Sequence, residues 1–200
     1  MINPVIEFDA EHHTYKVDGI TRPGVTSVLA AAGLSPDFSC IPPNVLEAKR
    51  KLGEDVHYYT MLCDSGFDVT DMHELQPYID GWKMFVKETG FKSLAREKIL
   101  YSPQHQYCGT VDAVGEAYGQ VALIDIKCSA VVDLTNTGPQ TAAYEQAWAE
   151  LKGEKINKRY VVKLMPNAYK LIPCKDKNDL QIFLYALQIY NWRMRNNGKH

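Results

Sequence analysis

The chain has 200 residues and a net charge of -2, with 46% hydrophobic and 23% charged residues. This composition is typical of a folded globular protein and excludes a disordered or fibrous chain. No apolar run reaches the roughly 18 to 20 residues that a membrane-spanning helix needs, and the N-terminus lacks the pattern of a secretory signal. We therefore expect no membrane segment, a cytoplasmic location and, at this length, one domain.

The two parts of the chain carry opposite charge. Residues 1–150 contain 11 basic and 21 acidic side chains, whereas residues 151–200 contain 11 basic and 3 acidic ones. A basic segment attracts phosphate whatever the base sequence, so Lys152, Lys155, Lys158 and Arg159 are candidates for contacts with DNA. Lysines that merely solvate a surface give the same pattern, and this alternative stays open.

Five cysteines are widely spaced, and no Cys-x-x-Cys pair occurs among them. Zinc and redox motifs are therefore absent from the sequence. An iron–sulfur cluster needs a group of closely spaced cysteine ligands, and we expect none. The expectation is five reduced thiols, mostly buried, that behave as small apolar side chains.

The N-terminal 42 residues are expected to form a cover over the core. Two short strands at residues 5–8 and 14–17 flank a polar turn and indicate a hairpin. A short helix is predicted over residues 26–32, closed by Gly33.

Two longer helices are predicted next. The first follows Pro42 and Pro43 and runs to about residue 63. Its apolar residues recur at helical spacing and are expected to face the core; they are Val45, Leu52, Val56, Tyr59 and Cys63. The second helix is predicted over residues 74–88, with Pro77 in its first turn.

Three strands follow, at residues 96–101, 107–116 and 121–127. If Gly119 and Gln120 form a two-residue turn, Tyr118 pairs with Val121. The same register places Asp112 opposite Lys127 and Val114 opposite Asp125. The two aspartates would then be diagonal neighbours on one face of the sheet, roughly 7 Å apart.

Three charged side chains are expected to share that face. Asp125 and Lys127 are two residues apart and project to one side of their strand, while Ile124 and Ile126 point into the opposite, apolar layer. Carboxylates gathered in this way are costly unless a cation neutralises them, and Mg²⁺ prefers oxygen ligands. A salt bridge between Lys127 and Asp112 on an exposed sheet surface is the alternative.

The next helix is predicted to open at Thr137-Gly138-Pro139. Gln140 and Tyr144 lie one turn apart on one face of it, and their polar tips suit holding a phosphate or a lysine. A half-buried amphipathic helix would give the same pattern. Two strands at residues 159–165 and 169–173 and a final helix over residues 178–195 complete the chain.

The ordered series Gly109-Thr110-Val111-Asp112, Asp125-Ile126-Lys127 and Gln140-x-x-x-Tyr144 resembles the PD-(D/E)XK nuclease superfamily, in its RecB-like and lambda-exonuclease-like branch. Gly53-x-x-x-His57 matches the motif that this branch carries on an upstream helix. The motifs cover residues 53–144, and Val111 stands where the superfamily often has proline.

This resemblance implies a mixed α/β (α+β) fold with a restriction-endonuclease-like core, a central mixed β-sheet flanked by helices in the order αβββαβ. The core would span residues 43–165 of a single nuclease domain that covers residues 1–200. Residues 1–42 would be the N-terminal cover, and residues 166–200 would supply a C-terminal strand and helix.

The implied activity is that of a metal-dependent DNA exonuclease in phage or bacterial recombination or repair. One or two Mg²⁺ or Mn²⁺ ions would be held by His57, Asp112, Asp125 and the backbone carbonyl of Ile126. Lys127, Gln140 and Tyr144 would complete the catalytic set. A separate recombinase or single-strand annealing protein is the kind of partner that the resemblance suggests.

Several assignments stay open at this level. Glu97 is a candidate additional ligand, but a slip of one residue would move it to the other face of the sheet. Tyr107 and Thr110 are candidates to flank the substrate. A structure-specific endonuclease of the same fold, a non-catalytic DNA-binding module and an enzyme with a closed pocket for a small phosphorylated substrate are the alternatives. The sequence does not indicate polarity of digestion, strand preference or oligomeric state.

Overall fold

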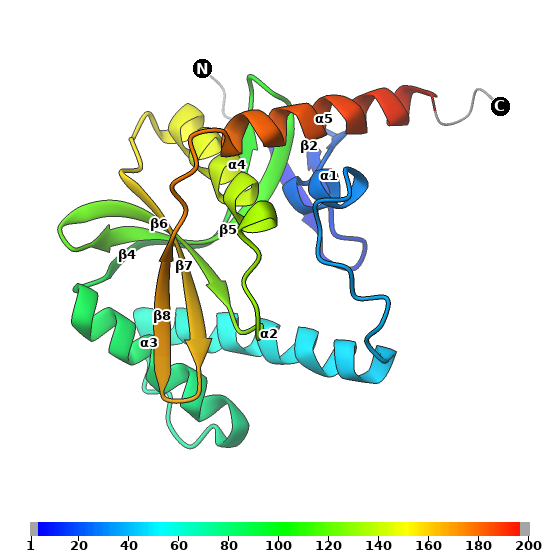
Figure 1. Ribbon diagram of the computed structural model, residues 1–200. Coiled ribbons are helices and arrows are strands. Elements are labelled where there is room, and N and C mark those ends of the chain that lie inside the picture. The colour runs from blue at the N-terminus through cyan, green and yellow to red at the C-terminus, as the bar shows by residue number, and fades with distance from the viewer. Residues whose placement is uncertain (1–3, 197–200) are drawn as a thin grey trace.

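A five-stranded sheet forms the centre of the molecule in the computed structural model, which describes residues 4–196 (Figure 1). Its strands, in spatial order, are β4 (Lys92–Ser102), β5 (Tyr107–Ala117), β6 (Gln120–Lys127), β7 (Lys158–Met165) and β8 (Ala168–Pro173). The pair β6 and β7 is parallel, and the other neighbours are antiparallel. The predicted mixed sheet is therefore confirmed.

Helices cover both faces of this sheet. On one face, α2 (Pro43–Asp64) and α3 (Gln76–Thr89) enclose an apolar cluster that includes Trp82, Phe85 and Ile124. On the other, α1 (Val25–Ala31), α4 (Leu134–Lys152) and α5 (Asp179–Asn196) enclose a second cluster around Tyr107 and Phe183. The helix α4 connects the parallel strands β6 and β7, because such strands need a long crossover. The predicted order αβββαβ is confirmed.

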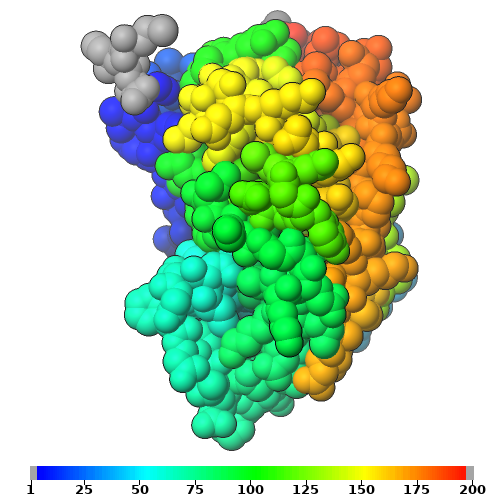
Figure 2. All heavy atoms as spheres, turned by 90° about the vertical axis from the view of Figure 1, so that its left-hand side faces the viewer, coloured from blue at the N-terminus to red at the C-terminus, as the bar shows by residue number. Residues whose placement is uncertain are grey.

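A separate three-stranded sheet forms the N-terminal cover. It consists of β1 (Ile6–Asp9), β2 (Thr14–Val17) and β3 (Ile20–Arg22), of which the sequence predicted the first two. The Tyr15 hydroxyl lies 2.9 Å from the hydroxyl of Thr110 on β5. A bridge between Gly24 and Cys108 adds a backbone contact to the same strand. In the side view of Figure 2, this cover (blue) lies at the opposite edge from β8 and the start of α5 (orange).

The first half of α2 does not pack on the core. Val45, which was predicted to face the core, is 42% exposed, whereas Val56 is fully buried. That part of the prediction is wrong, because only the second half of the helix lies against the sheet. A short 3-10 helix, η1 (His73–Leu75), precedes α3. Pro77 is the second residue of α3, where its missing N–H costs no hydrogen bond.

The turn between β5 and β6 differs from the prediction by one residue. Tyr118 and Gly119 form it, with φ values of 51° and 69°, and Ala117 pairs with Gln120. Positive φ at both central residues is the geometry of a type I′ turn, which matches the twist of the strands. The ladder register therefore shifts by two residues, so the predicted pairs of Asp112 with Lys127 and Val114 with Asp125 are wrong. A shift of two leaves the alternation of faces within the ladder unchanged. Beyond the end of the ladder the alternation of β5 is broken, because Val111 and Ala113 belong to the apolar clusters on opposite faces of the sheet.

The helix α4 begins earlier than predicted. Asp133 is its N-cap and accepts a hydrogen bond from the backbone N–H of Thr135 at 2.9 Å. Pro139 consequently lies inside the helix, not in its first turn as expected. The carbonyl of Gly138 accepts a hydrogen bond from Arg159 at 2.9 Å, which ties this part of α4 to β7.

All five cysteines are free thiols, of which Cys108 and Cys174 are buried and Cys40 is exposed. Within residues 4–196, none of the helices combines the length and the apolar character that crossing a membrane requires.

Candidate metal centre

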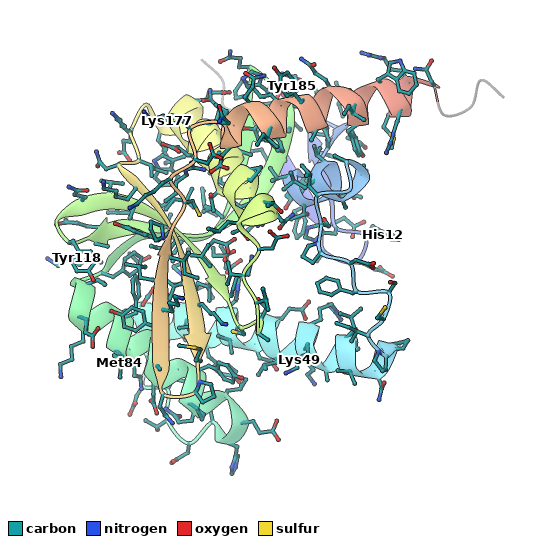
Figure 3. All side chains as sticks on the ribbon, viewed as in Figure 1. His12, Lys49, Met84, Tyr118, Lys177 and Tyr185 are labelled. Atoms are coloured by element: carbon teal, nitrogen blue, oxygen red, sulfur yellow. The ribbon has the colours of Figure 1, made fainter. Side chains whose placement is uncertain are left out.

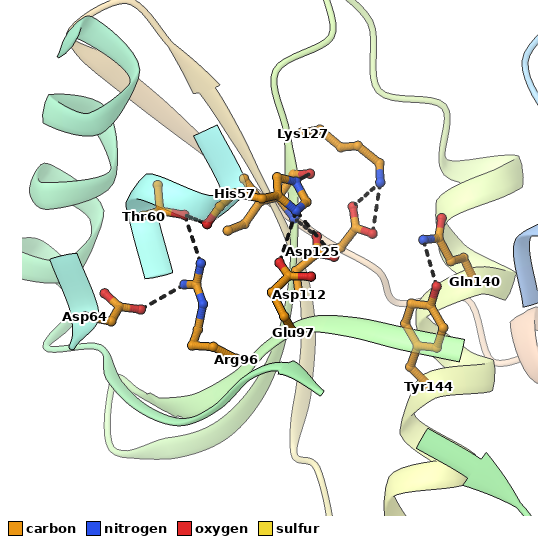
Figure 4. Close-up of polar contacts among 11 residues, drawn as sticks. His57, Thr60, Asp64, Arg96, Glu97, Asp112, Asp125, Lys127, Gln140 and Tyr144 are labelled. Atoms are coloured by element: carbon orange, nitrogen blue, oxygen red, sulfur yellow. Dashed lines mark hydrogen bonds and ion pairs between the residues drawn. The ribbon is translucent and has the colours of Figure 1, made fainter. Parts of the chain in front are cut away.

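The candidate site lies where β5 and β6 separate. Their ladder ends at the pair Ala113–Ile124, so the backbone of Ile126 has no partner on β5. Instead its N–H donates to Asp112 Oδ2 at 2.7 Å, and its carbonyl lies 3.0 Å from His57 Nε2 (Figure 4). Because a carbonyl only accepts, Nε2 carries the proton of that bond. The Asp112 carboxylate and the His57 imidazole thus bind the backbone groups of Ile126 that have no partner on β5, and this holds the two side chains beside each other.

Three side chains from three elements converge at this point. His57 Nδ1 is 3.3 Å from Glu97 Oε1 and 3.8 Å from Asp112 Oδ1. One ligand atom from each of the three residues lies within 4.8 Å of the others. Two carboxylate oxygens and an imidazole nitrogen are a donor set that could hold a divalent cation.

Glu97 reaches the cluster through an unusual backbone conformation. Its φ is 44°, in the left-handed region, which costs a residue with a side chain about 1 kcal/mol or more. Strain of this kind is found mainly where surrounding structure enforces it, often at functional sites. The sequence left Glu97 open because the loop of residues 102–106 does not fix the register of its strand, and the left-handed conformation of Glu97 is a further feature that strand periodicity does not indicate.

The charges of this cluster alter the titration of His57. Burial by itself would lower the pKa of the imidazole, but the charge of Asp112, together with the hydrogen bond and charge of Glu97, raises it to about 9. In the absence of a cation, His57 is therefore protonated at neutral pH and offsets part of the negative charge. A metal ion would take over that role and displace the proton.

Asp125 and Lys127 form an ion pair next to the cluster. The Lys127 ammonium lies 3.0 Å from Oδ1 and 2.9 Å from Oδ2 of Asp125, which is 1% exposed. Burial, partly countered by Lys127, raises the pKa of Asp125 to about 6. Ile124 and Ile126 belong to the core beneath α2 and α3, as predicted. The carboxylate that joins His57 and Asp112 is thus that of Glu97, and Asp125 is held by Lys127.

Gln140 and Tyr144 lie on α4 in contact with each other. Gln140 Nε2 donates to the Tyr144 hydroxyl at 3.3 Å, and both side chains are buried. Burial raises the pKa of Tyr144 well above its usual value, so the phenol keeps its proton. Because its oxygen already accepts a hydrogen bond, that proton is available to another acceptor.

Gly109 makes the close approach of Tyr144 to β5 possible. A Cβ atom at position 109 would lie 2.5 Å from the Tyr144 ring and 3.1 Å from Val25. The glycine of the Gly-Thr-Val-Asp series therefore has a steric role. It lets the tyrosine ring pack directly against the strand that carries Asp112.

A buried network behind the cluster was missed by the sequence analysis. Arg96 donates to Asp64 Oδ2 and to Thr60 Oγ1, both at 2.8 Å, and its guanidinium lies 4.8 Å from the centre of the Trp82 ring. Arg96 and Asp64 are each 7% exposed. This network joins α2, α3 and β4 next to His57 and Glu97. Neither spacing nor periodicity indicated that Asp64 and Arg96 would meet.

Two sequence-based expectations do not fit their surroundings. The Arg159 guanidinium is 10% exposed and is bound by Glu145 at 3.1 Å and Asp179 at 3.0 Å, so it is engaged within the fold and is not a free phosphate ligand. Tyr107 is fully buried and donates to the carbonyl of Ala143 at 2.7 Å, so it cannot flank a substrate. Lys155 and Lys158 are exposed. Lys158 pairs with Ala122, at the opposite end of β6 from Lys127.

No family model matches the sequence, and no curated protein sequence matches it. Among solved structures, LHK-Exo in complex with dAMP is similar with a TM-score of 0.44 and 12% identity, over 88% of this chain and 89% of that chain. The alkaline exonuclease LHK-Exo from Laribacter hongkongensis has a TM-score of 0.37 and 16% identity, over 89% and 94% of the two chains. At this similarity, neither structure carries an argument about activity, which is left to the geometry of the site.

Proposed function

We propose that this chain is a metal-dependent nuclease that hydrolyses phosphodiester bonds in DNA, as the resemblance to the PD-(D/E)XK superfamily implies. The convergence of His57, Glu97 and Asp112 within 4.8 Å carries the proposal. Two acidic groups and an imidazole in one place, beside an ammonium on a buried carboxylate, suit cation-assisted chemistry on a phosphate.

The residues of the chain would divide the work in the following way. His57, Glu97, Asp112, Asp125 and the carbonyl of Ile126 would hold one or two divalent ions, Mg²⁺ or Mn²⁺. When bound, the cation would polarise the scissile phosphate and lower the pKa of an attacking water.

Lys127 would direct its ammonium at the reacting phosphate, which stabilises negative charge that grows during hydrolysis. The Tyr144 phenol, with its oxygen held by Gln140, would donate a hydrogen bond toward the same group. Lys127 and Tyr144 lie on the side of β6 that faces α4, opposite the core beneath α2 and α3.

A metal titration with labelled DNA tests this function directly. We expect linear double-stranded DNA to be cleaved in Mg²⁺ or Mn²⁺ and to stay intact in EDTA. Resistance of covalently closed circular DNA would support the exonuclease mode, whereas its cleavage would support the endonuclease alternative. DNA binding without cleavage of either substrate would contradict the proposal and favour a non-catalytic module.

Substitution of Lys127 separates catalysis from metal binding. Lys127→Ala should reduce cleavage by about 100-fold or more, because a charge next to the transition state is lost. Mn²⁺ binding, measured by calorimetry, should persist because the three ligands at the cluster are intact. Lys163→Ala is the matched control, since Lys163 pairs with Lys127 on the adjacent strand and its ammonium is bound to the carbonyl of Ala130. Equal loss in both variants would contradict a specific role for Lys127.

A further inference from the structure

Three lysines lie side by side on the neighbouring strands β6, β7 and β8. Lys127 on β6 pairs with Lys163 on β7, and Lys163 pairs in turn with Lys170 on β8. Tyr169 and Leu171 pack on the apolar cluster beneath α2 and α3. Lys170, which lies between them in the strand, therefore projects from the opposite face, on which Lys127 also lies. The three residues form a lysine row that runs from the metal centre to the edge of the sheet.

The positive charge of the lysine row is only partly compensated. Lys127 is paired with Asp125. The ammonium of Lys163 is bound to the carbonyl of Ala130, which carries no net charge. Lys170 is exposed, and none of the ion pairs formed within residues 4–196 involves it. Like charges on directly paired residues are destabilising, so the row favours the binding of an anion.

The surroundings of the row add no negative charge from the hairpin itself. Residues 158–173, which form β7, β8 and their turn, contain four basic side chains and no acidic one. In the view of Figure 3, no helix lies in front of β8. A lysine on an edge strand can serve to prevent pairing with another sheet. That role would explain Lys170 but not Lys163, because β7 lies between β6 and β8.

We propose that one strand of the bound DNA leaves the metal centre across the end of β7 and is held by Lys170 at the edge of the sheet. The proposal rests on the proposed nuclease function and adds the direction in which the DNA runs. Lys170 would bind a phosphate of the backbone that is not the reacting one. Lys163, whose ammonium is already bound within the chain, is not a free phosphate ligand.

The length of the row favours an extended polyanion over a small anion. Neighbouring strands lie about 4.8 Å apart, so the backbones of Lys127 and Lys170 are separated by about 10 Å. A single phosphate group cannot span this distance. Each phosphate of a DNA strand occupies about 3.4 Å along the helix axis, so Lys170 would contact roughly the third phosphate from the reacting one.

The salt dependence of DNA binding tests the contact at Lys170. Binding of a labelled duplex is measured by fluorescence anisotropy in Ca²⁺. Lys170→Gln should lower the slope of log affinity against log salt by about 0.9, the contribution of one phosphate contact. Lys170→Arg should keep the wild-type slope, because the positive charge remains. Lys92→Gln is the matched control, exposed on β4 at the other edge of the sheet, and should also keep that slope.

This binding measurement separates the DNA path from the nuclease activity, because it needs no turnover. A chain that cleaves DNA but has equal slopes for Lys170→Gln and the wild type would overturn the path and leave the nuclease function standing. A chain that shows the expected change in slope, yet cleaves no DNA in Mg²⁺ or Mn²⁺, would contradict the nuclease function alone. A chain that binds no DNA would overturn both.

A scan with uncharged linkages tests where the strand runs. A single methylphosphonate replaces one phosphate at a time along each strand of a short duplex. The position that loses its effect on affinity in Lys127→Ala marks the metal centre, and the position that does so in Lys170→Gln marks the sheet edge. We expect the two positions on one strand, about three phosphates apart. A shared position, positions on different strands or no coupling to Lys170 at any position would overturn the proposed path.

Discussion

Gly53 is the residue of the predicted motifs whose role the fold does not explain. A Cβ atom at this position would meet nothing within 4 Å, and the residue lies inside α2. Glycine in a helix interior costs about 1 kcal/mol relative to alanine. No described part of the chain fills this space, and in the proposed nuclease we predict that DNA passes through it.

Gly53→Ala should therefore raise stability and lower activity. We expect the free energy of unfolding, measured with urea, to increase by about 1 kcal/mol. Cleavage of DNA should fall, since the added methyl group would stand in the path of the substrate. An alanine variant that is more stable and equally active would contradict the expectation that the substrate passes close to position 53.

His57 predicts a pH dependence of stability in the metal-free protein. Its pKa rises from 6.5 to about 9 on folding, because the charges of Asp112 and Glu97 outweigh burial. A base with a raised pKa contributes stability that is fully present below 6.5 and is lost as the pH rises through 9. The shift corresponds to about 3 kcal/mol at most. Urea unfolding in EDTA at pH 6.5, 8 and 9.5 should show this loss, and His57→Gln should lack it.

At the residue scale, the sequence predicted which side of a strand a residue faces better than which residues it contacts. The two-residue period of a strand places Asp125 and Lys127 on one side whatever the register. Which carboxylate approaches His57 depends on the left-handed conformation of Glu97 and on the end of the β5–β6 ladder. Neither follows from side-chain spacing, because both are set by contacts between distant segments.

The elements of the site are held together by the buried pair of Arg96 and Asp64. Arg96→Met would leave the Asp64 carboxylate without its cation in a 7% exposed position. Loss of one partner from a buried ion pair costs about 3–5 kcal/mol, and we expect a decrease of this order in urea unfolding. Metal affinity should fall as well, because Glu97 is the next residue on β4.

The double variant Arg96→Met, Asp64→Leu separates the loss of the pair from the burial of a lone charge. It should recover part of the stability, since no unpaired carboxylate remains. Arg50→Met is the control, on the same helix as Asp64. Arg50 pairs with Glu47 and Glu54 at the surface, so its substitution should change the free energy of unfolding little. A single variant at Arg96 as stable as the Arg50 control would contradict the structural role of the network.

At the element scale, the errors of the sequence analysis have local causes. The turn was predicted at Gly119 and Gln120, but it forms at Tyr118 and Gly119, where Tyr118 takes a positive φ that is unusual for a residue other than glycine. The start of α4 was placed at the Gly-Pro pair, although Asp133 provides a side-chain cap one turn earlier. The exposed half of α2 could not be told from its buried half, because the apolar spacing continues through both.

At the scale of the whole molecule, the order of elements was predictable and the use of the basic segment was not. Alternation of helical and strand periods indicates a mixed sheet with a crossover helix. The basic side chains of residues 151–200, however, differ in their surroundings. Arg159 is taken up by ion pairs with Glu145 and Asp179, whereas Lys155 and Lys158 stay exposed.

The exposed lysines at the start of β7 suit contacts with DNA beyond the reacting phosphate. Lys158 is five residues from Lys163, about 16 Å at the usual rise, and the odd spacing places it on the opposite face of β7 from Lys163, which pairs with Lys127. That length corresponds to about five phosphates of one DNA strand. Lys152 is the last residue of α4, and Lys155 lies in the connection that leads from α4 into the same strand. Because they lie far from Lys127, Lys152, Lys155 and Lys158 would contribute affinity for DNA without taking part in hydrolysis.

Replacement of Lys152, Lys155 and Lys158 with glutamine should weaken DNA binding and leave cleavage at saturating DNA unchanged. Each lost phosphate contact reduces the slope of log affinity against log salt by about 0.9 for duplex DNA. We expect the slope, measured by fluorescence anisotropy in Ca²⁺, to fall by about 2 to 3 in total. Glutamine at Lys87 and Lys92, exposed on α3 and β4, is the control; it removes two positive charges away from β7 and should change the slope little. An unchanged slope in the triple variant would place the DNA on another face, and a slower rate at saturation would bring these lysines into the reaction itself.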